Sequence, residues 1–300
     1  MAQTLLEAYG KYFNDMVKLS KAPALIDATN VYQEANKDLT PYMEMILKDN
    51  FLPGSGLGNV QYFKEFYEQV VNNGKRGLIL MEHYTNLDLP AIIYMLKEYG
   101  EPWAKDLSER IVAVAGMKLN EAGVGIRVWT EGFTRVVIYP TRSLDKVTES
   151  EVSEEEKANE EKKARTINFA AMRAMDACKK RGQVVLVFPS GTRYRPGKPE
   201  TKKGLREIDS YLRLFDIVLP VAINGNCLRI NPDKPDDMLA DVVTKDVVTL
   251  TAHPIINCKE FRDSKLASMP ADEPDPKQKI IDGIMEILDQ VHNEVEKTRA

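Results

Sequence analysis

The chain has 300 residues, of which 43% are hydrophobic and 29% charged, and its formal net charge is −4. These values are ordinary for a globular protein of one large or two unequal domains, and the acidic balance argues against a nucleic-acid partner. Three widely spaced cysteines exclude a disulfide framework and a zinc cluster and fit a reducing cytoplasm. The apolar runs fall far short of the roughly 18 residues that a spanning helix needs, so we expect a soluble or peripheral membrane protein.

Helical spacing of apolar residues dominates the first 75 positions. No signal peptide is expected, because the first twenty residues include acidic side chains and no continuous apolar stretch. Pro41 suits the first turn of a helix that reaches residue 50, and a Gly/Pro loop follows at 51–59. A further amphipathic helix is expected to stop at Gly74. We therefore predict an N-terminal helical bundle over residues 1–75.

From residue 76 onward, short apolar runs alternate with helical segments. Strands are predicted at 77–81, 111–116, 135–139, 183–189, 217–223 and 247–253, and helices at 89–99, 150–181, 202–214, about 235–241 and 276–297. Such alternation with nearly all-apolar strands is typical of the α/β class. We predict an α/β domain over residues 76–300, with a mixed, mostly parallel sheet flanked by helices. In such sheets ligands bind beyond the carboxyl ends of the strands.

The stretch EHYTNLDL places His83 directly after an apolar run and five positions before Asp88. Pro90 favours a helix start here, so the chain turns from strand into helix and the two side chains can approach. An aspartate bonded to one imidazole nitrogen leaves the other able to take a proton from an alcohol. Taken alone, the spacing favours the simpler alternative, in which Asp88 only caps the helix and His83 is incidental.

A second candidate is VVLVFPSGTRYRPG, which begins as a buried strand. Ser190 and Gly191 let the backbone turn with its N–H groups exposed, and Arg193 and Arg195 would lie on one side of an extended segment. Two guanidinium groups beside a glycine turn suit a phosphate, which arginine binds through paired charge-assisted hydrogen bonds. The alternative, a surface turn whose arginines pair with nearby acids, stays open.

A third stretch, RVVIYPTRSLDK, brings Arg142 and Ser143 beyond the carboxyl end of another predicted strand. A lone arginine is usually solvated. Polar residues from three strands on one rim are harder to dismiss than any one of them.

Together these stretches resemble the glycerolipid acyltransferase family, whose hallmarks are a His-x-x-x-x-Asp block and, about a hundred residues later, a block of the form F-P-x-G-T-R. The matching residues here are HYTNLD and FPSGTR, 105 residues apart. The sequence is most similar to the soluble, plastid-type glycerol-3-phosphate acyltransferases. That pattern has a Lys-His pair where this chain has Arg142-Ser143, so the acceptor stays open between glycerol 3-phosphate and 1-acylglycerol 3-phosphate.

The resemblance implies acyl transfer to the sn-1 hydroxyl of glycerol 3-phosphate, in the first step of phospholipid synthesis. His83 would be the general base, oriented by Asp88, with no covalent acyl-enzyme. The phosphate would be held by Arg142, Ser143, Arg193 and Arg195, and close backbone or oxyanion contacts would come from Ser190, Gly191 and Thr192.

The implied acyl donor is a thioester of acyl carrier protein or of CoA, with no cofactor and no metal. The compartment would be cytoplasmic or similar to the plastid stroma, and contact with a membrane stays open. A non-catalytic binder of phospholipid precursors is the alternative from a different class. It predicts binding without turnover.

Overall fold

The computed structural model describes residues 3–121, 123–141 and 153–299 and groups the chain into two compact units. Unit 1 comprises Met1–Gly10, Glu44–Ile111 and Gly182–Ala300, and unit 2 comprises Lys11–Met43 and Val112–Arg181. The expected boundary at residue 75 is not a limit of either unit, because the N-terminal helices α1 (Leu5–Leu19) and α2 (Thr40–Asn50) are divided between them.

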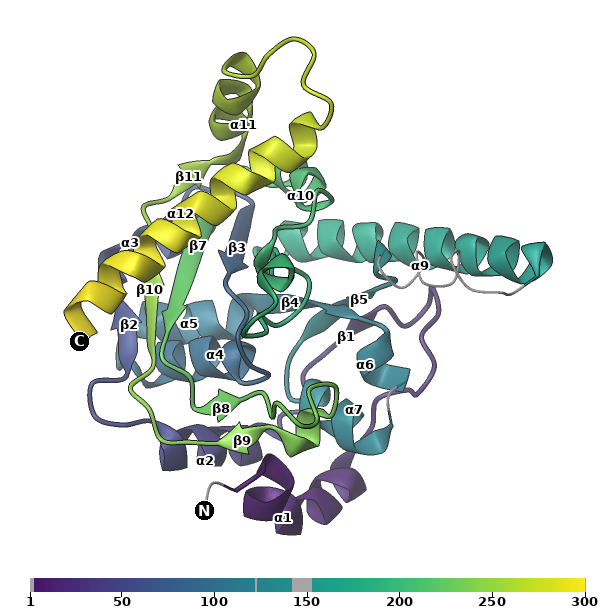
Figure 1. The fold of residues 1–300 in the computed structure, drawn as a ribbon, viewed down its shortest axis with the longest axis vertical. Helices are drawn as coiled ribbons and strands as arrows, with labels where there is room; N and C mark the ends of the chain where they lie inside the picture. Colours follow the sequence, from purple (N-terminus) through teal and green to yellow (C-terminus); the bar gives the residue numbers. More distant parts are fainter. Residues whose placement is uncertain (1–2, 122, 142–152, 300) are drawn as a thin grey trace. The chain divides into compact units, whose positions relative to one another are not determined.

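The strand β3 (Gly77–Met81) lies at the centre of the sheet of unit 1 (Figure 1). It pairs in parallel with β6 (Val184–Val187) and with β7 (Ile217–Asn224), and all three strands are buried along their whole length. Their sequences, apolar except for Asn224 at the end of β7, are typical of strands covered on both faces. The carboxyl ends of β3 and β6 therefore lie side by side.

Shorter strands complete unit 1. β7 is antiparallel to β10 (Thr249–Ala252) and to β11 (Ile256–Asn257), while β10 is parallel to β2 (Gly56–Gly58). A separate antiparallel ribbon consists of β8 (Leu228–Arg229) and β9 (Val242–Val243).

The helices of unit 1 cover this sheet, and α12 (Pro276–Arg299) crosses in front of β7 in Figure 1. Its apolar residues bury one side, as the spacing predicts, with Ile280, Ile281, Ile284 and Leu288 in the core. The other helical segments of unit 1 are α3 (Val60–Val71), α4 (Asp88–Glu98), α5 (Pro102–Arg110), η1 (Pro199–Lys202), α10 (Ile208–Leu214), η2 (Met238–Ala240) and α11 (Cys258–Ala267).

Unit 2 contains its own parallel strand pair, β4 (Ile111–Gly116) and β5 (Arg135–Ile138), with β1 (Tyr32–Gln33) antiparallel to β5. The long helix α9 (Glu154–Lys180) packs against β5 and begins with a capping box at Ser153. The short helices α6 (Lys118–Glu121) and α7 (Val124–Glu131) precede β5. The core of unit 2 is formed by Ile26, Val31, Met117, Val137, Tyr139, Ala164 and Ile167.

The predicted α/β class is confirmed, and so are the six strands predicted from apolar runs. The predicted helical region at 1–75 also contains the two-residue strand β1, and the predicted loop at 51–59 contains the strand β2. Strands of two or three residues are too short to show a hydrophobic period. Across the part of the chain that the structure describes, no helix combines the length and the apolar character needed to cross a membrane.

Candidate active site

His83 follows β3 at its carboxyl end, and the backbone there stays attached to the sheet. The N–H of the preceding residue, Glu82, donates to the carbonyl of Val221 at 3.1 Å. The position of His83 is thus fixed by a central buried strand rather than by a free loop.

The turn that follows brings Asp88 back against His83. Asp88 is the first residue of α4, and its Oδ2 lies 2.9 Å from His83 Nδ1. The same oxygen accepts the backbone N–H groups of Tyr84 at 2.6 Å and of Thr85 at 2.9 Å. The cap position belongs to Leu87. The alternative in which Asp88 only caps the helix is therefore wrong, because its side chain bonds backward into the turn.

This geometry gives the two nitrogens of the His83 ring different tasks. A carboxylate can only accept, so Nδ1 carries the proton and Nε2 of the neutral ring keeps its lone pair. The ring stacks on Phe188, with 3.9 Å between centroids and 13° between planes. The side chain of His83 is 16% exposed against 5% for Asp88. Nε2 thus belongs to a ring that Asp88 and Phe188 hold in place and that is still partly exposed to solvent.

The second block begins where β6 ends, next to the first. β3 and β6 are in register at Leu80 and Val187, so Phe188 follows beside His83. The N–H of Tyr194 donates to the carbonyl of His83 at 2.7 Å. The two sequence blocks, 105 residues apart, are therefore joined by a hydrogen bond and a ring stack.

The glycine turn of this block is closed on itself. Gly191 has φ 63° and its N–H donates to the carbonyl of Phe188 at 2.9 Å. The buried hydroxyl of Ser190 donates to the carbonyl of Thr192 at 2.7 Å. The expectation of N–H groups exposed by this turn is therefore wrong for Gly191, whose N–H closes the turn.

Replacing Gly191 with Ala should destabilise the fold. An added Cβ would lie 2.4 Å from Leu205 Cδ1. The alanine would also have to adopt the left-handed backbone conformation of Gly191. Gly197 has φ 78°, and a Cβ there would meet no atom of the described chain within 4 Å. Gly197→Ala should thus cost about 1–2 kcal/mol in unfolding free energy from the backbone alone. Gly191→Ala should cost about 1 kcal/mol more for the repacking of Leu205. Urea denaturation compares the two, and equal losses would contradict the contact.

Both arginines of the block reach carboxylates in the segment 236–241. Arg193 is buried and its Nη1 pairs with Oδ2 of the fully buried Asp241. Arg195 Nη2 lies 2.9 Å from Asp236 Oδ1, and the exposed fractions of these side chains are 26% and 85%. The alternative of arginines paired with acids is thus realised in both cases, in a buried pair and in an exposed one. Arg142 and Ser143 lie outside the described residues.

Sequence reasoning missed a set of hydrogen-bonded polar residues next to the His83–Asp88 pair. Glu82 is buried, and Nδ1 of His292, on the terminal helix, lies 3.0 Å from Glu82 Oε2. Burial and the adjacent Glu82 carboxylate raise the pKa of the Tyr84 hydroxyl, which stays a proton donor. The available signal was a glutamate directly after an all-apolar strand, because a buried carboxylate requires partners.

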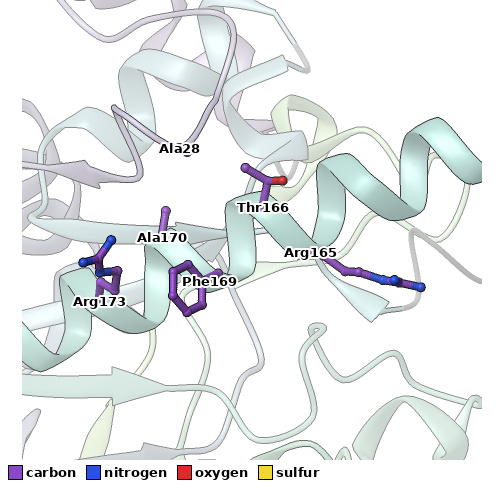
Figure 2. A pocket seen from close by; sticks show the side chains of 6 residues that line it. All are labelled: Ala28, Arg165, Thr166, Phe169, Ala170 and Arg173. Atoms are coloured by element: carbon purple, nitrogen blue, oxygen red, sulfur yellow. The ribbon is translucent and has the colours of Figure 1, made fainter.

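A hollow of about 610 Å³ lies elsewhere, on α9 in unit 2. Figure 2 shows the labelled side chains along α9, with Phe169 between Arg165 and Arg173. The guanidinium of Arg173 lies 5.5 Å from the centre of the Phe169 ring. The hollow offers cationic and apolar contacts, but its lining contains no proton acceptor comparable to His83. It is lined by Ala28, Arg165, Thr166, Phe169, Ala170 and Arg173.

Comparison with known proteins assigns the sequence that carries this site to a family. The Acyltransferase family matches residues 64–224, which is more than half of the chain and includes both sequence blocks. A comparison with curated proteins gives no match. The His83–Asp88 pair and the joined second block are thus features of a chain that belongs to the acyltransferase family.

Proposed function

We propose that the chain transfers a fatty acyl group from a thioester to the sn-1 hydroxyl of glycerol 3-phosphate. The observation that carries the proposal is the His83–Asp88 pair, in which Asp88 holds Nδ1 and leaves Nε2 as the proton acceptor. An alcohol needs such a base to become a competent nucleophile toward a thioester. The acyl donor in this proposal is acyl carrier protein or CoA.

The chemistry follows from the placement of the ring. Nε2 of His83 takes the proton of the acceptor hydroxyl as its oxygen attacks the thioester carbonyl carbon. The tetrahedral intermediate collapses, the carbon–sulfur bond breaks, and the departing thiolate takes the proton from the imidazolium. Asp88 stabilises the imidazolium charge throughout. The backbone N–H groups of Tyr84 and Thr85, which donate to Asp88, keep its carboxylate oriented.

The arginines of the second block support a phosphate-bearing acceptor. The Arg195–Asp236 pair is exposed, and exposed ion pairs contribute only about 0–1 kcal/mol, so a phosphate can displace Asp236 at little cost. Arg193 is anchored by Asp241, but a guanidinium has five N–H donors and one carboxylate does not exhaust them. In the proposal Arg195 provides the direct contact, and Arg193 completes the phosphate site.

Replacing Arg195 with Gln should raise KM for glycerol 3-phosphate by about 10- to 100-fold, because a charge-assisted hydrogen bond contributes about 1.5–3 kcal/mol. Stability should hardly change, since the pair with Asp236 is exposed. The matched control is Arg206→Gln, which removes another exposed arginine, 3.4 Å from Asp275. Steady-state kinetics on both variants decide the point. Equal KM values would remove Arg195 from the phosphate site.

The acceptor is tested by product analysis. Purified protein is incubated with acyl carrier protein or CoA thioesters and with glycerol 3-phosphate or 1-acylglycerol 3-phosphate, and thiol release and the acylated product are measured. Product from glycerol 3-phosphate supports the proposal, and product from the acylated acceptor alone assigns the second acylation instead. Binding of either acceptor without turnover would identify a non-catalytic binder.

A further inference from the structure

Glu82 and Tyr84, which flank His83 in the sequence, meet on the side of the chain that faces α12. The Tyr84 hydroxyl donates to Glu82 Oε1 at 3.1 Å, as residues i and i+2 of an extended segment can. Only 2% of the Glu82 side chain is exposed. A carboxylate buried to this degree is tolerated only when hydrogen bonds and opposite charges satisfy it.

Both oxygens of Glu82 are satisfied. Oε2 accepts the backbone N–H of Ile223 at 2.8 Å and the Nδ1–H of His292 at 3.0 Å. Oε1 accepts from Tyr84 and lies 3.5 Å from Lys202 Nζ. Through its carboxylate, Glu82, the residue before His83, thus contacts β7, α12 and η1. A fully satisfied buried network of this kind rigidifies its surroundings.

Tyr84 transmits this rigidity to the catalytic pair. Its ring stacks on His292, with 5.6 Å between centroids, and meets Tyr194 edge-on at 5.7 Å. Its backbone N–H makes the 2.6 Å bond to Asp88 Oδ2, the oxygen that holds His83. Any movement of Tyr84 therefore moves a donor to Asp88.

Two basic side chains, His292 and Lys202, face the Glu82 carboxylate. Burial lowers the pKa of His292, but the hydrogen bond to Glu82 raises it, and the net pKa lies above the ordinary value. Burial also lowers the pKa of Lys202, while Asp289, 2.5 Å away, and Glu82 raise it to a net value above the ordinary one. Tyr84 and Glu296 also face His292, and Glu296 adds to the rise in its pKa.

We propose that Glu82, Tyr84 and His292 are positioning residues that hold the His83–Asp88 pair in its reactive geometry, so that α12 supports catalysis from the far end of the chain. The proposal rests on the proposed role of His83 as the base. The contacts of these three residues with protein groups indicate that they act through Asp88 and the backbone of His83.

Glu82→Gln tests the network with an isosteric change. The amide keeps one acceptor oxygen and has an N–H2 donor in place of the other, so either His292 or Tyr84 loses the Glu82 oxygen that accepts from it. We expect kcat to fall by about 10- to 100-fold, the loss that follows when a catalytic group shifts by about 1 Å, with KM unchanged. The matched control is Asp209→Asn, because Asp209 is also fully buried and pairs with Arg213 and Arg262. Thermal unfolding ensures that the comparison is made where both variants are folded.

A pair of substitutions at His292 separates hydrogen bonding from packing. Gln at this position can still donate to Glu82 Oε2, whereas Leu, of similar size, cannot. We expect His292→Leu to lower kcat like Glu82→Gln, and His292→Gln to recover most of the loss. Equal kcat values in the two His292 variants would overturn the hydrogen-bond role.

A readout independent of turnover keeps this test apart from the test of the proposed function. In the free protein, the imidazole NMR signals of His83 should shift in Glu82→Gln and in His292→Leu, but not in Asp209→Asn. If no acceptor is acylated, the proposed function fails, and these signals still decide whether the network positions His83. Wild-type signals in both network variants would overturn the proposal.

Discussion

Replacing His83 with Gln is expected to lower kcat by about 10³-fold or more, because general-base catalysis by a positioned side chain contributes about 10²–10⁴-fold. Gln keeps a polar side chain of similar reach but has no nitrogen able to accept the hydroxyl proton. Binding of the phosphorylated acceptor should survive, since the arginines that we assign to it lie in the second block.

The measurement combines single-turnover acyl transfer with calorimetric titration of glycerol 3-phosphate. His253 is the matched control, because it also follows a strand of unit 1, β10, and is half-buried like His83, with Nδ1 2.8 Å from the carbonyl of Pro254. His253→Gln should leave kcat unchanged. If the two variants retain the same turnover, His83 is not the base.

Asp88 shows how far local sequence can predict such a site. The strand before His83 is all apolar, and the residues to Asp88 are just enough to turn from strand into helix, so the approach of the two side chains could be predicted. The role of the turn could not, because it depends on which backbone N–H groups Asp88 accepts. Asp88 accepts the N–H groups of Tyr84 and Thr85 in the turn instead of capping the helix.

Partners distant in sequence were beyond such reasoning. The bond between His292 and Glu82 spans 210 residues, and that between Arg193 and Asp241 spans 48. Hydrophobic periodicity predicted a terminal helix, but it gave no partner for His292. Which strand a helix meets is set by tertiary packing. A buried polar pair between distant segments therefore becomes visible only in the fold.

Breaking the Arg193–Asp241 pair is expected to cost about 3–5 kcal/mol in unfolding free energy, the usual result when one partner of a buried ion pair is removed. Arg193→Ala would leave the carboxylate of Asp241 buried without its cation. Such a variant would lose activity even if Arg193 never touched a phosphate. An alanine substitution alone would therefore say little about the acceptor site.

A double substitution separates these two roles. Arg193→Met with Asp241→Leu replaces the pair by apolar groups of similar volume, which is often neutral or stabilising, so most of the lost stability should return in a urea denaturation cycle. If phosphate binding needs the Arg193 guanidinium, the double variant will be stable but will bind glycerol 3-phosphate weakly. Full recovery of KM together with stability would assign Arg193 to the fold alone. Failure to recover stability would show that the pair contributes more than charge compensation.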